Sequence, residues 1–383
     1  MENTKIFEII NGNNMFSQEL DMRFWHVHNI LSYVVETNHY SDSTALKNYL
    51  NIQKIQFYKK INELASILKV FESNGVDYRI IKGIGISMTY PKPFTRGFSD
   101  FDILISKKDF EYSIKLLESI GYYKTTSTDH DVTFEKEGAT KIELHFCLFT
   151  EKSNLNSSII NEMIWEMPKT IQVKDLIIKI PDKNIHFQYI FLHMIKHLKY
   201  KGIGLRFLID IKWFVQVNRI DLVEHHKVFA NLGYDKIYKA VLYICKRHLS
   251  LTVPDKLCDD LDMEVINWLM NYIIESGVFG SYIENRKSLD LYVSLLGKVS
   301  WARDNNFISF VFPTENRLNV RYDYAKKFPI LIPLAWIHRV VYTIFRKDLS
   351  WKEKIFFTNS NKRTFNRNKK MFEYLGIEYG ITS

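Results

Sequence analysis

The chain has 383 residues, of which 46% are hydrophobic and 25% are charged, and its formal net charge is +9. This composition excludes a wholly disordered protein and allows a well-buried core, and the length suggests two domains. The positive charge favours anionic partners such as nucleotides, although a lysine-rich composition gives the same balance without any partner.

Cysteine usage and the first residues of the chain lead us to expect a cytoplasmic protein. Cys147, Cys245 and Cys258 are widely separated and lack the spacing of a zinc site or a disulfide framework, which fits a reducing compartment. Residues 1–30 contain no apolar segment of a secretory signal. The apolar stretch Phe328–Phe345 is interrupted by a proline, a histidine and an arginine, so we expect a buried helix there rather than a membrane span.

The first 180 residues alternate between helical and strand patterns. Residues 15–75 are expected to be helical, with an N-cap region at Ser41–Ser43 and a helix end at Ser73–Gly75. The expected strands are Tyr78–Ile81, Asp100–Ser106, Tyr122–Thr125, Val132–Lys136 and Lys141–Phe149, with a further strand pair within Lys169–Ile180. The expected helices between them are Ile84–Tyr90, Lys107–Ile120 and Asn154–Glu166.

Beyond Pro181 the pattern is almost wholly helical. The sequence therefore predicts an α+β fold, in which a small mixed or antiparallel sheet with flanking helices precedes an α-helical domain. We place the domains at 1–75, 76–180 and 181–350, followed by a basic C-terminal segment, 351–383, that is a solvated face or a contact for anions or a membrane surface. The expected helices of this half are Ile185–Tyr200, Leu205–Val217, Asp221–Leu232, Asp235–Leu249, Leu261–Ser276 and Leu289–Arg303.

Three carboxylates on two expected strands form a candidate metal site. Asp100 and Asp102 are two residues apart, so a strand places both on one face and leaves Phe101 and Ile103 on the other. Glu143 follows in a second strand between apolar neighbours. Carboxylate oxygens gathered in this way suit a hard divalent cation such as Mg²⁺ or Mn²⁺.

These residues carry a resemblance to a known family. The motifs are Lys82-Gly83, Arg96, Ser-Asp-Phe-Asp-Ile-Leu-Ile and Ile-Glu-Leu-His, followed by His193, His197, Arg206 and Asp210 in a helical region. From about Leu64 to about Val217 the chain resembles the bacterial uncharacterised nucleotidyltransferases, which are grouped with the DNA polymerase beta-like nucleotidyltransferases. The resemblance implies that Asp100 and Asp102 bind metal. It also implies that Glu143 completes the metal site and can activate the attacking hydroxyl, and that Lys82 and Gly83 hold phosphate.

The turn at Gly83 departs from the commoner signature of that superfamily, which is Gly-Ser. Here Gly83 is followed by isoleucine, so Ser87 is the candidate replacement for the missing hydroxyl contact to phosphate. A helix that begins after Gly83 would present free N–H groups to an anion. Lys82 and Arg96 would add cationic contacts to the phosphates, and pairing of Arg96 with Asp100 is the alternative.

Several polar residues are candidates for the acceptor side. His145 shares a face with Glu143 and either lines the site or is a satisfied sheet histidine. His197 and His193 share a helix face, which suits a wall of the nucleotide cleft or plain packing better than zinc, because no glutamate stands between them. Arg206 and Asp210 form a local ion pair or orient the acceptor. His225 and His226 are expected to be exposed.

The function we expect is Mg²⁺-dependent transfer of a nucleoside monophosphate from a nucleoside triphosphate such as ATP to a hydroxyl-type acceptor, small or macromolecular. The alternative is a catalytically silent module of the same fold that binds nucleotides or proteins. Nucleic acid is not indicated, because the sequence lacks the basic and aromatic strand motif of single-strand binders. Membrane-surface contact through Phe328–Phe345 and the basic segment is a weaker hypothesis.

Overall fold

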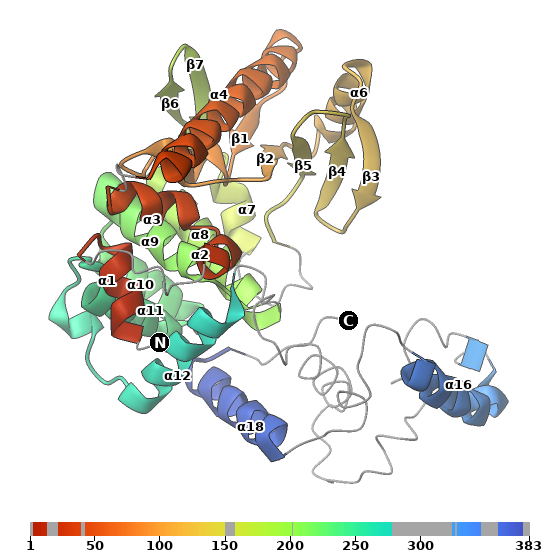
Figure 1. Cartoon of the computed structure of the whole chain (residues 1–383). Helices are drawn as coiled ribbons and strands as arrows, with labels where there is room; N and C mark the ends of the chain where they lie inside the picture. Colours follow the sequence, from red (N-terminus) through yellow and green to blue (C-terminus); the bar gives the residue numbers. More distant parts are fainter. Residues whose placement is uncertain are drawn as a thin grey trace. The chain divides into compact units, whose positions relative to one another are not determined.

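The structure is a computed structural model that describes residues 3–13, 22–39, 43–149, 158–200, 202–277, 324–325, 328–345 and 359–377. The chain divides into two compact units, Met1–Gly280 and Ser281–Ser383. The boundary expected between residues 180 and 181 falls inside the first unit. Figure 1 labels the described elements along the chain.

The first unit contains all the described strands and most of the described helices. The strands are β1 (Tyr78–Ile80), β2 (Asp100–Ile105), β3 (Tyr123–Ser127), β4 (Asp131–Glu135), β5 (Lys141–His145), β6 (Lys169–Val173) and β7 (Leu176–Ile180). The helices are α1 (Asn3–Ile10), α2 (Met22–Val27), α3 (Leu31–Thr37), α4 (Thr44–Ser73), α5 (Ile84–Ser87), α6 (Phe110–Ser119), α7 (Ser158–Met163), α8 (Lys183–Tyr200), α9 (Leu205–Asn218), α10 (Leu222–Asn231), α11 (Asp235–Leu249) and α12 (Met263–Ser276).

The expected α+β fold is confirmed. Five strands form one mixed sheet in the order β1-β2-β5-β4-β3, and β6 and β7 form a separate two-stranded sheet. Within the larger sheet, β2 and β5 are parallel and the other pairs are antiparallel. A parallel pair needs a long connection, and here α6, β3 and β4 lie between β2 and β5 in the chain.

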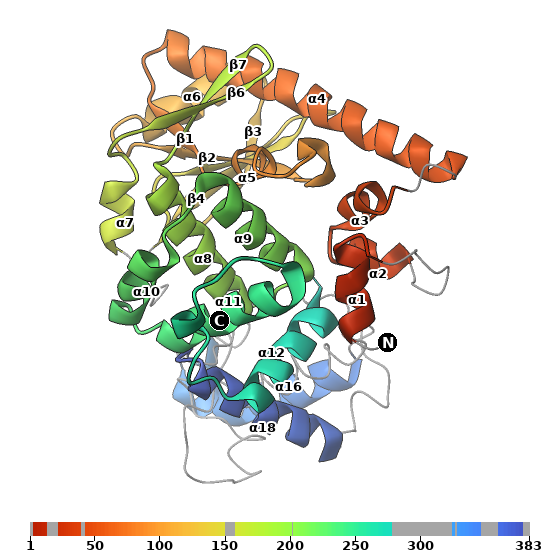
Figure 2. The ribbon, with the colours of Figure 1, turned by 90° about the vertical axis from the view of Figure 1, so that its left-hand side faces the viewer.

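One face of the larger sheet is apolar and packs on α4 and α6. Phe101 and Ile103 of β2 and Ile142 of β5 share a core with Leu64 of α4 and Leu117 of α6. These side chains leave water together, which is the main favourable contribution to the fold. Figure 2 shows α4 on one side of the sheet and α8 and α9 on the other. The opposite face of β2 and β5, which carries the acidic residues, is therefore free to form a site with the helical part of the chain.

Several element boundaries differ from those expected. Helix α4 is continuous from Thr44 to Ser73 instead of two helices, and Ser43 caps it by accepting a hydrogen bond from the N–H of Leu46 at 3.4 Å. Helix α5 ends at Ser87 rather than Tyr90, because the N–H groups of Thr89 and Tyr90 donate three residues back, as in a 3-10 turn, before Pro91. Residues 15–21 and 289–303, also expected to be helical, lie outside the described residues.

In the second unit, the described residues include the helices α16 (Ile332–Phe345) and α18 (Asn359–Tyr374). A buried helix was expected within Phe328–Phe345, and this is wrong for four apolar side chains. These are Phe328, Ile330, Leu334 and Ile337, which are 62%, 87%, 54% and 62% exposed. The expected basic C-terminal segment contains a helix, α18, that buries Met371 and Phe372. Among the described residues, no helix combines the length and the apolar character that crossing a membrane requires.

Candidate active site

Two neighbouring parallel strands hold the acidic residues. In the register of β2 and β5, Asp102 lies opposite Glu143. Asp100 lies two residues earlier on β2, opposite Lys141. The expected alternation is confirmed, since Phe101 and Ile103 point into the core that α4 closes. The strand period thus places all three carboxylates on the face that α8 and α9 cover.

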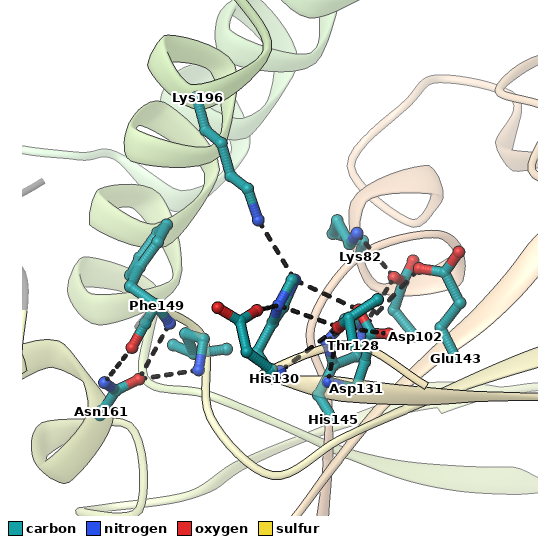
Figure 3. Close-up of polar contacts among 12 residues, drawn as sticks. Lys82, Asp102, Thr128, His130, Asp131, Glu143, His145, Phe149, Asn161 and Lys196 are labelled. Atoms are coloured by element: carbon teal, nitrogen blue, oxygen red, sulfur yellow. Dashed lines mark hydrogen bonds and ion pairs between the residues drawn. The ribbon is translucent and has the colours of Figure 1, made fainter. Parts of the chain in front are cut away.

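Asp102 is the centre of the polar contacts on this face. The ammonium of Lys82 lies 2.6 Å from its Oδ1, and Nε2 of His145 lies 3.2 Å from the same oxygen (Figure 3). Burial disfavours the charged form of Asp102, but Lys82 and His145 outweigh it and hold the pKa of Asp102 well below its usual value. Burial also lowers the pKa of His145, which favours the neutral imidazole.

Glu143 reaches further toward solvent, with its side chain 31% exposed and Oε2 3.8 Å from Nε2 of His145. Burial and the negative charges of Asp102 and Asp100 raise the pKa of Glu143 to about 7. Burial and Asp102 also raise the pKa of Asp100. The site therefore contains more acidic groups than its cations neutralise.

The residues present fit a hard divalent cation. Ligand atoms of Asp102, Glu143 and His145 all lie within 4.8 Å of one another, and two of the three residues offer the carboxylate oxygens that Mg²⁺ and Mn²⁺ prefer. Lys82 and His145 both contact Oδ1 of Asp102, and no contact described for this residue uses Oδ2. A cation bound here would offset the repulsion that raises the pKa of Glu143. Asp100 is not in this set of three, although it lies on the same face.

The turn at Gly83 requires glycine for its backbone. Its φ of 54° and ψ of −113° lie where a side chain is strongly disfavoured. Ser87 is fully buried and its hydroxyl donates to the carbonyl of Gly83 at 2.8 Å, so this hydroxyl stabilises the turn and we do not assign it to phosphate. Helix α5 has only four residues, which is too short for the helix N-terminus expected after Gly83 to act as an anion site.

Arg96 pairs with Asp210, whereas the sequence suggests a phosphate or Asp100 as its partner. Its Nε and Nη2 donate to the two carboxylate oxygens of Asp210 at 3.0 and 2.9 Å, and both residues are buried. The expected local pair of Arg206 with Asp210 is wrong, because Arg96 bonds to both oxygens of Asp210 and no ion pair between Arg206 and Asp210 is found among the described residues. A buried arginine takes the partner with which it can form two parallel hydrogen bonds.

Helix α8 forms the wall opposite the acidic face. Tyr189 is hydrogen-bonded to Lys82, and burial and the positive charge of Lys82 hold the pKa of His193 well below its usual value. His197 stacks edge-on against His193, with ring centroids 4.5 Å apart. The two rings pack against each other, and their place in the wall of a nucleotide cleft stays a prediction. The expected exposure of the histidine pair on α10 is wrong for His225, which is buried.

Sequence reasoning missed a group of polar residues at the start of β4. His130 and Asp131 lie beside His145, and Lys196 of α8 approaches His130 at 3.2 Å (Figure 3). The signal in the sequence was the polar run Thr128-Asp129-His130-Asp131, which lies between two expected strands. Such a run is also typical of an ordinary turn, and only the pairing of β4 with β5 brings it to the site.

The solved structures that resemble the chain include the following two. One is the lincosamide antibiotic adenylyltransferase LnuA in its lincomycin-bound form, with 19% identity, a TM-score of 0.31, and coverage of 41% of this chain and 96% of that one. The other is an antigenic nucleotidyltransferase-like protein from Paracoccidioides brasiliensis, with 15% identity, a TM-score of 0.31, and coverage of 42% and 77%. No curated protein is significantly similar in sequence.

The sequence family described as "Uncharacterised nucleotidyltransferase" matches residues 26–250. The match spans more than half of the chain and includes the turn at Gly83, the acidic strands, and helices α8 and α9. The chain belongs to the family of uncharacterised nucleotidyltransferases.

Proposed function

We propose that the protein transfers a nucleoside monophosphate from a nucleoside triphosphate to a hydroxyl-type acceptor, in a reaction that depends on Mg²⁺, as in DNA polymerase beta-like nucleotidyltransferases. The observation that carries this proposal is the pairing of Asp102 with Glu143 across two parallel strands, with the Lys82 ammonium on the same carboxylate. Family membership gives the reaction class, and this geometry supports a working site.

The residues of the site suit such a transfer. Asp102 and Glu143 would hold the divalent cations, and Asp100 adds negative charge on the same face. When bound, these ions would bind the phosphate oxygens and neutralise the charge that develops during displacement. Lys82 would contact the phosphates as a point charge, since the Asp102 carboxylate outweighs its burial and keeps its pKa above the usual value.

The chemical step is an in-line displacement. A bond forms between the acceptor oxygen and the α-phosphorus, the bond from that phosphorus to the α–β bridging oxygen breaks, and pyrophosphate leaves. The proton of the acceptor hydroxyl would pass to Glu143. Its carboxylate can accept that proton in the ionised form, which a bound cation favours, and its partial exposure leaves room for an acceptor.

The test uses ATP and Mg²⁺ with the full chain, measuring binding by calorimetry and turnover by pyrophosphate release. Asp102→Asn and Glu143→Gln are expected to lower turnover by about 10²–10⁴-fold. Asp175→Asn, in the exposed turn between β6 and β7, is the matched control and should leave turnover unchanged. Unchanged turnover in Asp102→Asn would refute the proposal. Nucleotide binding without pyrophosphate release, with any acceptor tried, would favour the silent module instead.

A further inference from the structure

A short loop between β3 and β4 is organised by one hydroxyl. The backbone N–H groups of His130 and Asp131 point to Oγ1 of Thr128 at 3.3 and 3.2 Å, and this hydroxyl donates to Oδ1 of Asp131 at 2.9 Å. The loop therefore has a defined shape. Because Oδ1 of Asp131 is occupied by Thr128, Oδ2 is the oxygen that faces the neighbouring histidines.

His130 lies between two carboxylates and an ammonium group. Its Nδ1 lies 2.8 Å from Oδ1 of Asp129, and its Nε2 lies 3.2 Å from Oδ2 of Asp131. When Nδ1 carries the proton and donates it to Asp129, Nε2 is a lone-pair acceptor. Two acceptor atoms then face each other at 3.2 Å, an arrangement that needs a cation between or beside them. In the structure Nζ of Lys196 approaches Nε2 to 3.2 Å (Figure 3).

His145 has the same relation to its own carboxylate. Its Nε2 lies 3.2 Å from Oδ1 of Asp102, and its Nδ1 lies 3.9 Å from Oδ2 of Asp131. Each of the two imidazoles thus has one nitrogen on a carboxylate and directs the other toward Asp131. Histidines that bind metal ions almost always show this arrangement, because the carboxylate fixes the tautomer and makes the free nitrogen more basic.

We propose that Nε2 of His130, Oδ2 of Asp131 and Nδ1 of His145 form a binding site for a divalent transition-metal ion. One ligand atom from each of the three residues lies within 4.8 Å of the ligand atoms of the other two. The separations of 3.2 and 3.9 Å from Oδ2 of Asp131 to the two nitrogens bracket the roughly 3.3 Å expected between ligands of a tetrahedral zinc ion. Two imidazoles and one carboxylate favour Zn²⁺ or Co²⁺ over Mg²⁺.

A metal ion can reach the site from solvent, and the ammonium of Lys196 competes with it for Nε2 of His130. The side chains of His130 and Asp131 are 19% and 12% exposed, so an ion can enter from solvent. The ammonium of Lys196 occupies the cationic position next to Nε2 of His130 and has to leave when an ion binds. The site shares His145 with the group of Asp102 and Glu143, but it uses Nδ1 of this ring, whereas Nε2 contacts Asp102. It does not depend on the proposed nucleotidyl transfer.

The experiment titrates the full chain with Co²⁺ and Zn²⁺ in the presence of excess Mg²⁺, following the visible absorption of Co²⁺ and the heat of Zn²⁺ binding. We expect one Co²⁺ ion per chain with the intense absorption of a nitrogen-ligated tetrahedral ion. His130→Ala should weaken binding by more than about 100-fold, and Asp129→Asn by about 10–100-fold. His226→Ala is the matched control, because it removes a histidine of α10 that pairs with Asp235 of α11, and it should bind as the native chain does.

Lys196→Met separates a metal site from a network of ion pairs. If the three ligand atoms bind a metal ion, removal of the competing ammonium tightens binding about tenfold or more. If His130 is instead a protonated member of a salt-bridge network, neither the native chain nor Lys196→Met binds Co²⁺, and the proposal is overturned. Equal Co²⁺ affinity in His130→Ala and the native chain would also overturn it. Loss of pyrophosphate release in Glu143→Gln with Co²⁺ binding retained would leave this inference standing independently of the catalytic proposal, because Glu143 is not among the three proposed ligands.

Discussion

Arg96 and Asp210 form a buried, bidentate ion pair although 114 residues separate them in the sequence. The Tyr90 hydroxyl also donates to Oδ1 of Asp210, at 2.7 Å. Arg96 directly follows the 3-10 turn η1 (Pro93–Thr95) and precedes β2, while Asp210 lies on α9. The pair therefore links α9 to the segment that leads into β2.

Replacement of Asp210 by alanine is expected to destabilise the fold strongly. It would leave the Arg96 guanidinium buried without a counter-charge, which costs about 3–5 kcal/mol of the free energy of unfolding. Urea unfolding of the native chain and Asp210→Ala measures this loss. Lys227→Ala removes a pair with Glu224 whose side chains are both 64% exposed, and as the control it should leave the unfolding midpoint unchanged. A loss below about 1 kcal/mol in Asp210→Ala would contradict the assignment.

Glu143→Gln is expected to stabilise the fold in a way that depends on pH. Burial and nearby negative charges raise the pKa of Glu143 from its ordinary value of 4.5 to about 7, so ionisation of this group opposes folding. The cost is absent below pH 4.5 and complete above about pH 7. The gain from Glu143→Gln should therefore grow across this window to about 1–3 kcal/mol.

Urea unfolding of the native chain and Glu143→Gln at pH 4.5 and pH 8 checks this window. Glu137→Gln, in the exposed turn before β5, is the control for the loss of a glutamate. Saturating Mg²⁺ should reduce the gain at pH 8, because a bound cation favours the ionised carboxylate. A gain of equal size at both pH values would show that the surroundings of Glu143 do not raise its pKa.

The faces of β2 and β5 were predictable from the sequence because they follow from a local rule. In the run from Asp100 to Ile105, a period of two separates the acidic from the apolar side chains, and no knowledge of the partner strand is needed. The direct opposition of Asp102 and Glu143 is a different kind of fact. It depends on β5 lying parallel to β2 and between β2 and β4, an order that only long-range packing determines.

The same distinction explains the residues that sequence reasoning placed wrongly. Helical spacing suggests Arg206 as the partner of Asp210, but the bidentate partner is Arg96, from a distant segment. Ser87 looks like a phosphate contact in sequence, yet the chain uses its hydroxyl to close the Gly83 turn. His130 lies in a run typical of a turn, and its neighbours His145 and Lys196 come from other elements.

Gly83→Ala tests whether the turn needs glycine for conformation or for space. A Cβ at this position would lie 3.5 Å from the carbonyl oxygen of Asp100 and 3.7 Å from Cβ of Phe98, which are ordinary contacts. The backbone conformation is the obstacle, and its strain should cost about 1–3 kcal/mol in urea unfolding. Gly138→Ala, with φ of +70° and no atom within 4 Å of its Cβ, is the comparison and should cost about 1 kcal/mol. Equal costs would show that Gly83 occupies an ordinary turn position.

Lys82→Met is expected to affect metal and nucleotide binding in opposite directions. The ammonium lies 2.6 Å from Asp102, where it repels a cation bound to the same carboxylate, so its removal should tighten Mg²⁺ binding about tenfold. The same change removes a charged hydrogen bond to phosphate and should weaken ATP binding by about 10–100-fold. Calorimetry with Mg²⁺ alone, and with ATP at saturating Mg²⁺, separates the two effects. Lys136→Met, which removes a contact to the carbonyl of Ile120, is the control. If Lys82→Met weakened both ligands equally, Lys82 would serve only to hold Asp102 in place.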